Sequence, residues 1–509
     1  MTSAATDPSL RRLVNGVLWP GFTGLAAPDW LARELDDGLA GVVYFGHNID
    51  PDDAGQPARL SAELRGLRPD VLIGIDEEGG NVSRLDAARG SPFPGHAQLG
   101  GLDDVDVTEA VGGMIGRRAA SAGANVVLAP VADVNTNPAN PVIGVRAFGR
   151  DTALVARHVA AMVRGLQQTG VAACVKHFPD HGDTNTDSHL ALPRLDLSWA
   201  EIERDHLPPF RAAVAAGVRA VMTAHIVVPG RGELPATLNR RILGALRQTG
   251  FSGTIVTDAL DMAAIRASFG AGEGAVLAIL AGAELLCIGN PSNLGPNGGR
   301  TADQDDYLEV RGALYDALDD GRLGAEALER AGASAARLAP AANPVAAAEP
   351  GPRRGAEQDA ADAADAGRIV RSAITVRGVT TLAPHRLSLL DLRARATMAE
   401  ASTTDVFAAG LAVAYDLDRR TPGTDPAALA ACLAEIPAGN GVAVLVDRIA
   451  VAGAQREAVS HLAALRPDAV VINAGLPAPD LLPLAVIDCR GSSKVTADTV
   501  RGILSGDAA

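Results

Sequence analysis

The chain has 509 residues, of which 47% are hydrophobic and 3% aromatic, and its formal net charge is −15. This composition is typical of a globular protein and excludes a disordered chain. The acidity disfavours nucleic acid or an anionic membrane surface as a partner, because phosphate binding depends on basic patches. The length exceeds one ordinary core and predicts more than one domain.

The cysteines and the N-terminal segment indicate a cellular compartment. Cys174, Cys287, Cys432 and Cys489 lie far apart in the sequence and form no CxxC pair, so buried free thiols are expected. The first residues show no apolar signal segment, and no apolar run reaches the roughly 18 residues of a membrane span. We therefore expect a cytoplasmic protein with no membrane partner. A monomer is expected, since no segment signals an interface.

Short apolar runs rich in Val, Ile and Leu recur through the first part of the chain. They are GVVYF (41–45), VLIGID (71–76), NVVLAPV (125–131), AACVKH (172–177), AVMTAH (220–225), TIVTD (254–258) and ELLCIG (284–289). None alternates with polar residues, which is typical of strands buried on both faces of a parallel sheet. VNGVLWPG (14–21) is the candidate first strand.

Amphipathic segments of helical length separate these runs, for example residues 152–170 and 200–217. Strand and helix alternate about eight times, which predicts an α/β fold with a (β/α)8 TIM-like barrel over residues 1–340. Residues 341–360 are rich in Pro, Ala and charge and are expected to form a linker. Further apolar runs over residues 361–509 predict a smaller C-terminal α/β sandwich domain with a mostly parallel sheet.

Polar side chains stand at the end of one apolar run after another. These residues are Asp76, Lys176 with His177, His225 and Asp258. In a barrel the carboxyl ends of the strands converge on one mouth, where active sites lie. We therefore expect these groups to meet.

The stretch KHFPDHGDTNTDSH, from Lys176 to His189, combines three histidines and three aspartates with a lysine. Asp187 and His189 are two residues apart, so in an extended loop the carboxylate can hold one imidazole nitrogen. A histidine oriented in this way is a competent general acid and base near neutral pH. A salt bridge that only stabilises the loop is the alternative. A divalent metal site is a second alternative, with the candidate ligands His177, His181, Asp183, Asp187 and His189.

Three further carboxylates have two readings each. Asp258 in GTIVTDALDM is either a structural hydrogen-bond acceptor or a nucleophile that faces the mouth, and Asp261 is the weaker candidate for that role. Glu77 and Glu78 either grip sugar hydroxyls or are solvated charges at a helix N-terminus. The solvated reading is favoured for Glu78.

Six motifs, in this order, resemble glycoside hydrolase family 3. They are IDEEGGNVSRL, APVADVN, NPVIGVRAFGRD, KHFPDHGDTNTDSH, VMTAHIVVP and GTIVTDALDM. The loop that ends in DSH resembles more narrowly the bacterial β-N-acetylhexosaminidase (β-N-acetylglucosaminidase) branch of the peptidoglycan-recycling type. The resemblance covers roughly residues 10–340 and implies an enzyme that needs no cofactor and no metal.

The resemblance also implies roles for individual residues. Asp258 matches the catalytic nucleophile, and His189 supported by Asp187 matches the general acid/base. The residues that match those holding the hydroxyls of N-acetylglucosamine (GlcNAc) are Asp76, Arg146, Lys176 and His177. His225 joins this substrate-binding set from its place at a strand end. The implied mechanism is retaining, through a covalent glycosyl–enzyme intermediate.

The expected function is therefore a retaining exo-β-N-acetylglucosaminidase. It would hydrolyse terminal non-reducing GlcNAc from muropeptides or chito-oligosaccharides. Two alternatives stay open: a phosphorylase that uses phosphate as the acceptor, and a catalytically impaired sugar-binding protein. The family's usual glycine in KHFPGHG is Asp180 here, which carries a cost if that position needs a positive φ and adds a negative charge near the loop.

Overall fold

The computed structural model describes residues 4–188, 191–289, 302–339, 352–382, 385–393, 406–451 and 453–506. The chain forms two compact units. The barrel unit comprises Met1–Glu77, Thr108–Val134 and Arg150–Glu349, and the sheet unit comprises Glu78–Val107, Asn135–Gly149 and Pro350–Ala509. The predicted boundaries, with a barrel to residue 340, a linker over 341–360 and a sandwich from 361, remain a prediction.

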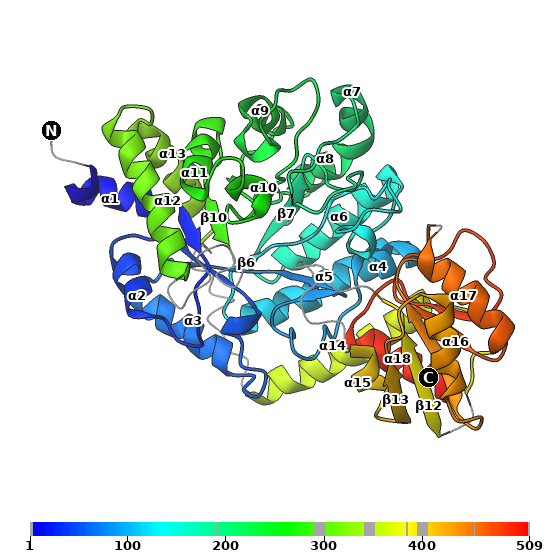
Figure 1. Cartoon of the computed structure of the whole chain (residues 1–509). Helices are drawn as coiled ribbons and strands as arrows, with labels where there is room; N and C mark the ends of the chain where they lie inside the picture. Colours follow the sequence, from blue (N-terminus) through cyan, green and yellow to red (C-terminus); the bar gives the residue numbers. More distant parts are fainter. Residues whose placement is uncertain are drawn as a thin grey trace. The chain divides into compact units, whose positions relative to one another are not determined.

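Eight parallel strands among the described residues form a barrel (Figure 1). Six pair in the order β2–β3–β6–β7–β8–β9, and β1 pairs with β10. Parallel bridges from Gly21 to Val43 and from Val256 to Leu285 join these two sets, so the ring of strands closes. The strands are β1 (Leu18–Pro20), β2 (Gly41–Tyr44), β3 (Leu72–Ile75), β6 (Val126–Val127), β7 (Ala172–Phe178), β8 (Ala220–Thr223), β9 (Thr254–Val256) and β10 (Leu286–Gly289). The predicted (β/α)8 fold is confirmed.

Each apolar run that predicted a barrel strand overlaps one of these strands. Strand β6 is shorter than its run, because Pro130 has no N–H to donate to a ladder. Trp19 on β1 lies fully buried inside the barrel, where its Nε1 donates to the carbonyl of Leu72 (3.2 Å). A Cβ at Gly74 would come within 2.2 Å of the indole, so the glycine on β3 makes room for the largest core side chain.

Helices alternate with the barrel strands and lie outside them in Figure 1. The longer ones are α1 (Pro8–Asn15), α2 (Asp29–Asp36), α3 (Gln56–Leu67), α5 (Val105–Ser121), α6 (Thr152–Gln167), α8 (Pro208–Ala215), α9 (Arg240–Gln248), α11 (Ala271–Ala281), α12 (Ala302–Asp319) and α13 (Ala325–Ala336). Short elements are η1 (Ala4–Thr6), η2 (Gly46–Asn48), α7 (Trp199–Glu201), η5 (Ala236–Leu238) and α10 (Ala263–Arg266). The helix predicted over residues 200–217 is divided by a π-helical turn, η4 (Ile202–His206), just before Pro208 and Pro209.

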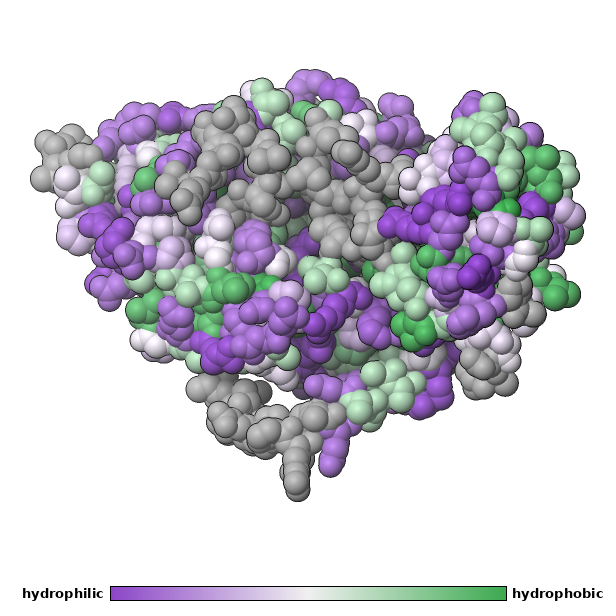
Figure 2. Space-filling model, turned by 60° about the horizontal axis from the view of Figure 1, so that its bottom comes forward, coloured by the Kyte–Doolittle hydropathy of each residue, from purple (hydrophilic) through white to green (hydrophobic). Residues whose placement is uncertain are grey.

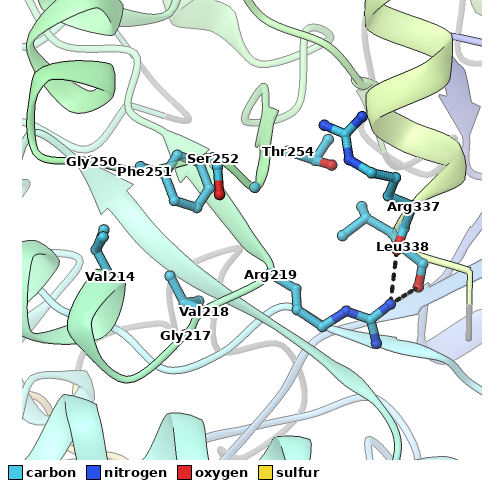
Figure 3. A pocket seen from close by; sticks show the side chains of 11 residues that line it. Val214, Gly217, Val218, Arg219, Gly250, Phe251, Ser252, Thr254, Arg337 and Leu338 are labelled. Carbon is cyan, nitrogen blue, oxygen red and sulfur yellow. Dashed lines mark hydrogen bonds between the residues drawn. The ribbon is translucent and has the colours of Figure 1, made fainter.

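The amino-terminal end of the barrel is closed by the residues that end α13. Leu338 is buried in the same core cluster as Trp19. Arg219, which precedes β8, donates from Nη2 to the carbonyls of Arg337 (2.9 Å) and Leu338 (3.0 Å), as Figure 3 shows. A cavity of about 280 Å³ beside this contact is lined by residues that precede β8 and β9. Its place at the amino-terminal ends of the strands indicates a structural region, since barrel active sites lie at the opposite end.

The sheet unit is built on a six-stranded sheet with the order β11–β16–β15–β14–β12–β13. Strand β11 runs antiparallel to β16 and the other neighbours are parallel. The strands are β11 (Thr375–Arg377), β12 (Arg386–Asp391), β13 (Asp416–Arg420), β14 (Gly441–Val446), β15 (Val470–Asn473) and β16 (Ala485–Asp488). This mostly parallel α/β sheet confirms the predicted class of the C-terminal region.

Helices complete the sheet unit together with two segments from the first part of the chain. The elements are α4 (His96–Leu102), η3 (Gly144–Arg146), α14 (Pro352–Ala373), α15 (Val406–Leu411), α16 (Pro426–Ala434), α17 (Ala454–Leu465) and α18 (Lys494–Ser505). A hairpin of β4 (Glu77–Gly79) and β5 (Val82–Ser83) leads into this unit. Buried Gln98 on α4 donates to the carbonyl of Cys489 (2.9 Å) and to Thr496 (3.0 Å), which ties the early segment to β16 and α18.

The surface is polar with small apolar groups. Figure 2 shows hydrophilic residues interspersed with smaller hydrophobic groups on the face in view. Some of the most exposed large hydrophobic side chains belong to the sheet unit: Val379 (84%), Val413 (74%) and Leu481 (82%). No helix in the described part of the chain is long and apolar enough to cross a membrane. All four cysteines are free, three of them buried and Cys432 half-buried.

Candidate active site

The predicted site residues of the barrel unit stand at the carboxyl ends of four strands. Asp76 follows β3 directly, and Lys176 and His177 are among the last three residues of β7. His225 comes two residues after β8, and Asp258 comes two residues after β9. Three of these residues are close enough to act on one buried group. Burial raises the pKa of the Cys174 thiol on β7, and the charges of Lys176, Asp76 and Asp258 also affect this pKa. The barrel therefore brings these distant positions to one end, as expected from the topology.

Asp76 and Lys176 form a buried ion pair across the barrel end. The Lys176 Nζ lies 2.6 Å from the Asp76 Oδ1, and the two side chains are 4% and 15% exposed. Burying a lone charge is costly, and the contact offsets that cost for both groups. The pair presents an acceptor and a cationic donor side by side, which suits the recognition of sugar hydroxyls.

Asp133 is a fully buried carboxylate in contact with His177 that sequence reasoning missed. Its Oδ2 lies 2.7 Å from the Nδ1 of His177, and its Oδ1 accepts from the backbone N–H of His181 (2.8 Å). Burial raises the pKa of Asp133, but the imidazoles of His177 and His181 outweigh it and hold the pKa below its ordinary value. The carboxylate therefore fixes the Nδ1–H form of His177 and leaves Nε2 for other partners. Its place in the APVADVN motif, just after β6, was the available signal.

His181 fastens the loop that follows β7. Its Nδ1 lies 2.6 Å from the Thr184 hydroxyl, and its Nε2 lies 3.0 Å from the Ser188 hydroxyl. The Thr184 hydroxyl donates its proton to the carbonyl of His181 (3.0 Å), so it accepts from Nδ1–H, and Ser188 donates to Nε2. Burial, followed by the charge of His177, lowers the pKa of His181 to about 4. The ring is therefore neutral at pH 7 and holds both ends of the turn from Thr184 to Ser188.

Asp258 is half-buried and close to the residues above. Its Oδ1 accepts from the backbone N–H of Ala259 (2.8 Å). Its negative charge reaches both Cys287 on β10 and His181. A partly exposed carboxylate at the carboxyl end of a barrel strand fits a nucleophile better than a purely structural acceptor. Asp261 is more buried, at 6% exposure, which agrees with its weaker candidacy.

His225 is fully buried, and both of its ring nitrogens are engaged. Nδ1 lies 2.8 Å from the Thr237 hydroxyl, and Nε2 donates to the carbonyl of Ala259 (2.9 Å). His225 thus supports the backbone next to Asp258. Its predicted contact with substrate stays a prediction.

Arg146 lies in η3 of the sheet unit and is held by Glu78 in a bidentate pair of 2.9 and 2.7 Å. Both residues are buried, at 6% and 1% exposure. The expectation that Glu78 is a solvated charge at a helix N-terminus is therefore wrong, since it lies in strand β4 and neutralises a buried arginine. The predicted role of Arg146 in holding a sugar hydroxyl stays a prediction.

The predicted acid/base pair is described in part. Asp187 is buried, at 8% exposure, and its carbonyl accepts from the backbone N–H of Ala191 (3.1 Å). His189 lies outside the described residues, so its role stays a prediction. Within the described ranges no group of three or more His, Cys, Asp or Glu side chains is placed to hold a metal ion.

Comparison with known proteins agrees with this geometry. The family model "Glycosyl hydrolase family 3 N terminal domain" matches residues 28–325. "Beta-hexosaminidase A" of Pseudoalteromonas piscicida is 35% identical over 326 residues, which cover 59% of this chain and 53% of that protein. "Beta-hexosaminidase" of Neisseria meningitidis serogroup C (strain 053442) is 35% identical over 272 residues, which cover 52% of this chain and 74% of that protein.

A solved structure extends the likeness to the whole chain. It is a glycoside hydrolase family 3 β-N-acetylglucosaminidase from Paenibacillus sp. str. FPU-7, with a TM-score of 0.80 and 30% sequence identity, and the match covers 98% of this chain and 97% of that one. Fold, strand-end residues and relatives together define a glycoside hydrolase. The chain belongs to glycoside hydrolase family 3. It spans about half of the Pseudoalteromonas protein (53%).

Proposed function

We propose that this chain is a retaining exo-β-N-acetylglucosaminidase that removes a terminal non-reducing GlcNAc from muropeptides or chito-oligosaccharides. The observation that carries the proposal is the half-buried Asp258 near the ion pair Asp76–Lys176 and the hydrogen-bonded pair Asp133–His177, at one end of a family 3 barrel. The names of the relatives support the N-acetyl sugar as substrate.

In the first step Asp258 attacks the anomeric carbon. The bond from that carbon to the leaving-group oxygen breaks, and protonated His189, oriented by Asp187, gives its proton to this oxygen. A glycosyl ester on Asp258 results. In the second step neutral His189 removes a proton from water, which attacks the anomeric carbon and releases Asp258. Two inversions give net retention.

The remaining residues hold the sugar ring. Ionised Asp76 accepts from a hydroxyl, while Lys176 and His177 Nε2 contact neighbouring oxygens. Their pairing within the barrel keeps them in place before substrate arrives, so little free energy is lost in ordering them.

Phosphate is the alternative acceptor in the second step. A neutral histidine leaves the acceptor position less negatively charged than a second carboxylate does, so an anion can approach. In that case the product is GlcNAc-1-phosphate instead of GlcNAc. We further propose that the protein works as a cytoplasmic monomer, in keeping with its four free cysteines.

The test compares hydrolysis of nitrophenyl β-N-acetylglucosaminide and nitrophenyl β-glucoside, each with and without phosphate. The proposal predicts strong preference for the N-acetyl sugar and a β-configured first product by NMR. Faster turnover with phosphate, with GlcNAc-1-phosphate as product, identifies a phosphorylase. Preference for the glucoside, or an α-configured product, contradicts the proposal. Binding of GlcNAc without any turnover indicates a sugar-binding protein.

A further inference from the structure

Asp180, the residue that departs from the family's usual glycine, lies at the start of the loop after β7. Its side chain is 1% exposed. One carboxylate oxygen accepts from the backbone N–H of Val134 (2.8 Å) and lies 2.7 Å from the Nδ1 of His206, and the other accepts from the backbone N–H of Gly182. Among the described non-glycine residues only Asp103 and Arg490 have a positive φ, so Asp180 does not occupy a strained backbone position.

The carboxylate of Asp180 fastens the loop against the segment that follows β6. An ionised carboxylate can only accept hydrogen bonds, and three N–H groups donate to its two oxygens. Each of these donors therefore has an acceptor. The two chain segments approach closely at this point, because a Cβ at Gly182 would come within 2.1 Å of the Val134 carbonyl oxygen. A change at Asp180 therefore releases the turn that leads into Asp187.

His206 reaches Asp180 from a different element. It is the last residue of the π-helical turn η4, in which the backbone N–H of Leu207 donates to the carbonyl of Ile202 (2.9 Å), and it is 3% exposed. The charged groups around it are Asp180, Asp183 and Asp205, and those around Asp180 are His206 and Asp133. Burial, opposed by the charge of His206, raises the pKa of Asp180 to about 6, so the carboxylate is ionised at pH 7.

We propose that Asp180 and His206 are a positioning pair for the glycosyl transfer described above, and that they fix the part of the loop over residues 180–188, which carries Asp187 of the proposed acid/base pair. The inference rests on the proposed function. Neither side chain contacts substrate in this account. They act through the backbone of residues 180–182, and Asp133 and His181 hold the next part of the same loop.

The test uses two substrates that differ in their need for an acid. Chitobiose has a poor leaving group and needs proton transfer, whereas a dinitrophenyl glycoside does not. The variants Asp180→Gly and His206→Leu should lower kcat/KM, which reports the first step, by about 10- to 100-fold on chitobiose and by less than about 3-fold on the dinitrophenyl glycoside. His206→Asn should retain most activity, because its amide N–H takes the place of Nδ1–H.

Two controls sharpen the result. Asp205→Asn removes an exposed charge next to His206 without touching the pair and should leave both rates unchanged. The double variant Asp180→Gly/His206→Leu should be no worse than Asp180→Gly alone, since the two residues act as one unit. The ratio of the two rates in one sample does not depend on the folded fraction. Equal losses on both substrates, additive losses, or an unaffected Asp180→Gly variant would overturn the proposal.

Hydrogen exchange provides a readout that needs no turnover. Peptides that cover residues 179–188 should exchange faster in Asp180→Gly and His206→Leu than in the wild type, and His206→Asn should stay protected. If the wild type turns over neither substrate, the proposed function fails, yet this measurement still decides whether the pair holds the loop. Unchanged exchange in all variants contradicts the positioning role.

Discussion

The barrel unit and the sheet unit both place acidic side chains at the carboxyl ends of parallel strands, but they neutralise them with different partners. In the sheet unit, Asp391 at the end of β12 is bound by Arg393 (2.9 Å) and Arg419 (3.0 Å), and Asp488 at the end of β16 is bound by Arg377 (2.7 Å). In the barrel unit, Asp76 is paired with Lys176.

The partner of each carboxylate differs between a purely structural ion pair and a candidate catalytic site. Arginine stays charged at every working pH and grips a carboxylate through several N–H groups, so its pairs are static. The barrel end instead combines the Asp76–Lys176 ion pair with three histidines near the half-buried Asp258, namely His177, His181 and His225. A carboxylate at a strand end is therefore no sign of catalysis unless titratable partners surround it.

The largest effect is expected at Asp258, the half-buried carboxylate that follows β9. Asp258→Ala should lower kcat on nitrophenyl β-N-acetylglucosaminide by at least about 1,000-fold, because no ester intermediate forms. The melting temperature should stay close to that of the wild type, since the Asp258 carboxylate is half-buried. Activity that survives this change would remove Asp258 from the nucleophile role.

Breaking the barrel's ion pair should damage both stability and catalysis. Lys176→Met removes the cation that lies 2.6 Å from the half-buried Asp76, which costs about 3 kcal/mol of unfolding free energy. It should also lower kcat/KM by roughly 100-fold, because the hydroxyl contact is lost. Urea unfolding and initial rates measure the two effects. Loss of stability with unaltered kcat/KM would assign the pair to structure alone.

The matched change in the sheet unit should damage stability only. Arg393→Met removes the bidentate partner of Asp391, whose side chain is 6% exposed. It should cost less free energy of unfolding than Lys176→Met, because Arg419 still contacts this carboxylate (3.0 Å). At temperatures where the variant is folded, kcat and KM should remain within about 2-fold of the wild type. A large change in KM would show that the arginine clamps also serve the substrate.

A smaller, pH-dependent effect is expected at His181. Its pKa falls from 6.5 to about 4 on folding, so its contribution to stability is present above pH 6.5 and is lost as the pH falls toward 4. Between pH 7 and pH 5 this loss amounts to about 2 kcal/mol. His181→Asn keeps a donor for Thr184 and should lack this part of the acid destabilisation.

Tryptophan fluorescence reports the unfolding of the barrel unit, which contains His181, because Trp19, Trp30 and Trp199 all belong to that unit. Urea midpoints of the wild type and His181→Asn should converge as the pH falls from 7 to 5. Parallel curves would show that His181 does not titrate in the folded barrel between these pH values.

The sequence predicts the barrel well because each strand is buried on both faces and reads as an unbroken apolar run. Strand β13 escapes prediction, since DLDRR is a polar strand at the edge of its sheet. The predicted helix over 200–217 gives no hint of its π-helical turn, which places His206 against Asp180.

The placement of candidate residues at one end of the barrel was predictable from the strand ends, as with Asp76, Lys176 and Asp258, whose roles stay predictions. The pairings were not predictable, because the partners are remote in sequence: Asp133 lies 44 residues before His177, and Asp180 lies 26 before His206. Glu78 was misjudged for the same reason, since its partner Arg146 lies 68 residues away.

The most direct test of the account is mass spectrometry of the enzyme after brief incubation with a 5-fluoro-GlcNAc fluoride, a substrate that forms the glycosyl ester faster than it is hydrolysed. The account predicts one added sugar per chain, located at Asp258 by fragmentation of the peptide that contains it, and no adduct in Asp258→Ala. Full consumption of the reagent with no adduct, or an adduct on another carboxylate such as Asp76, would contradict it.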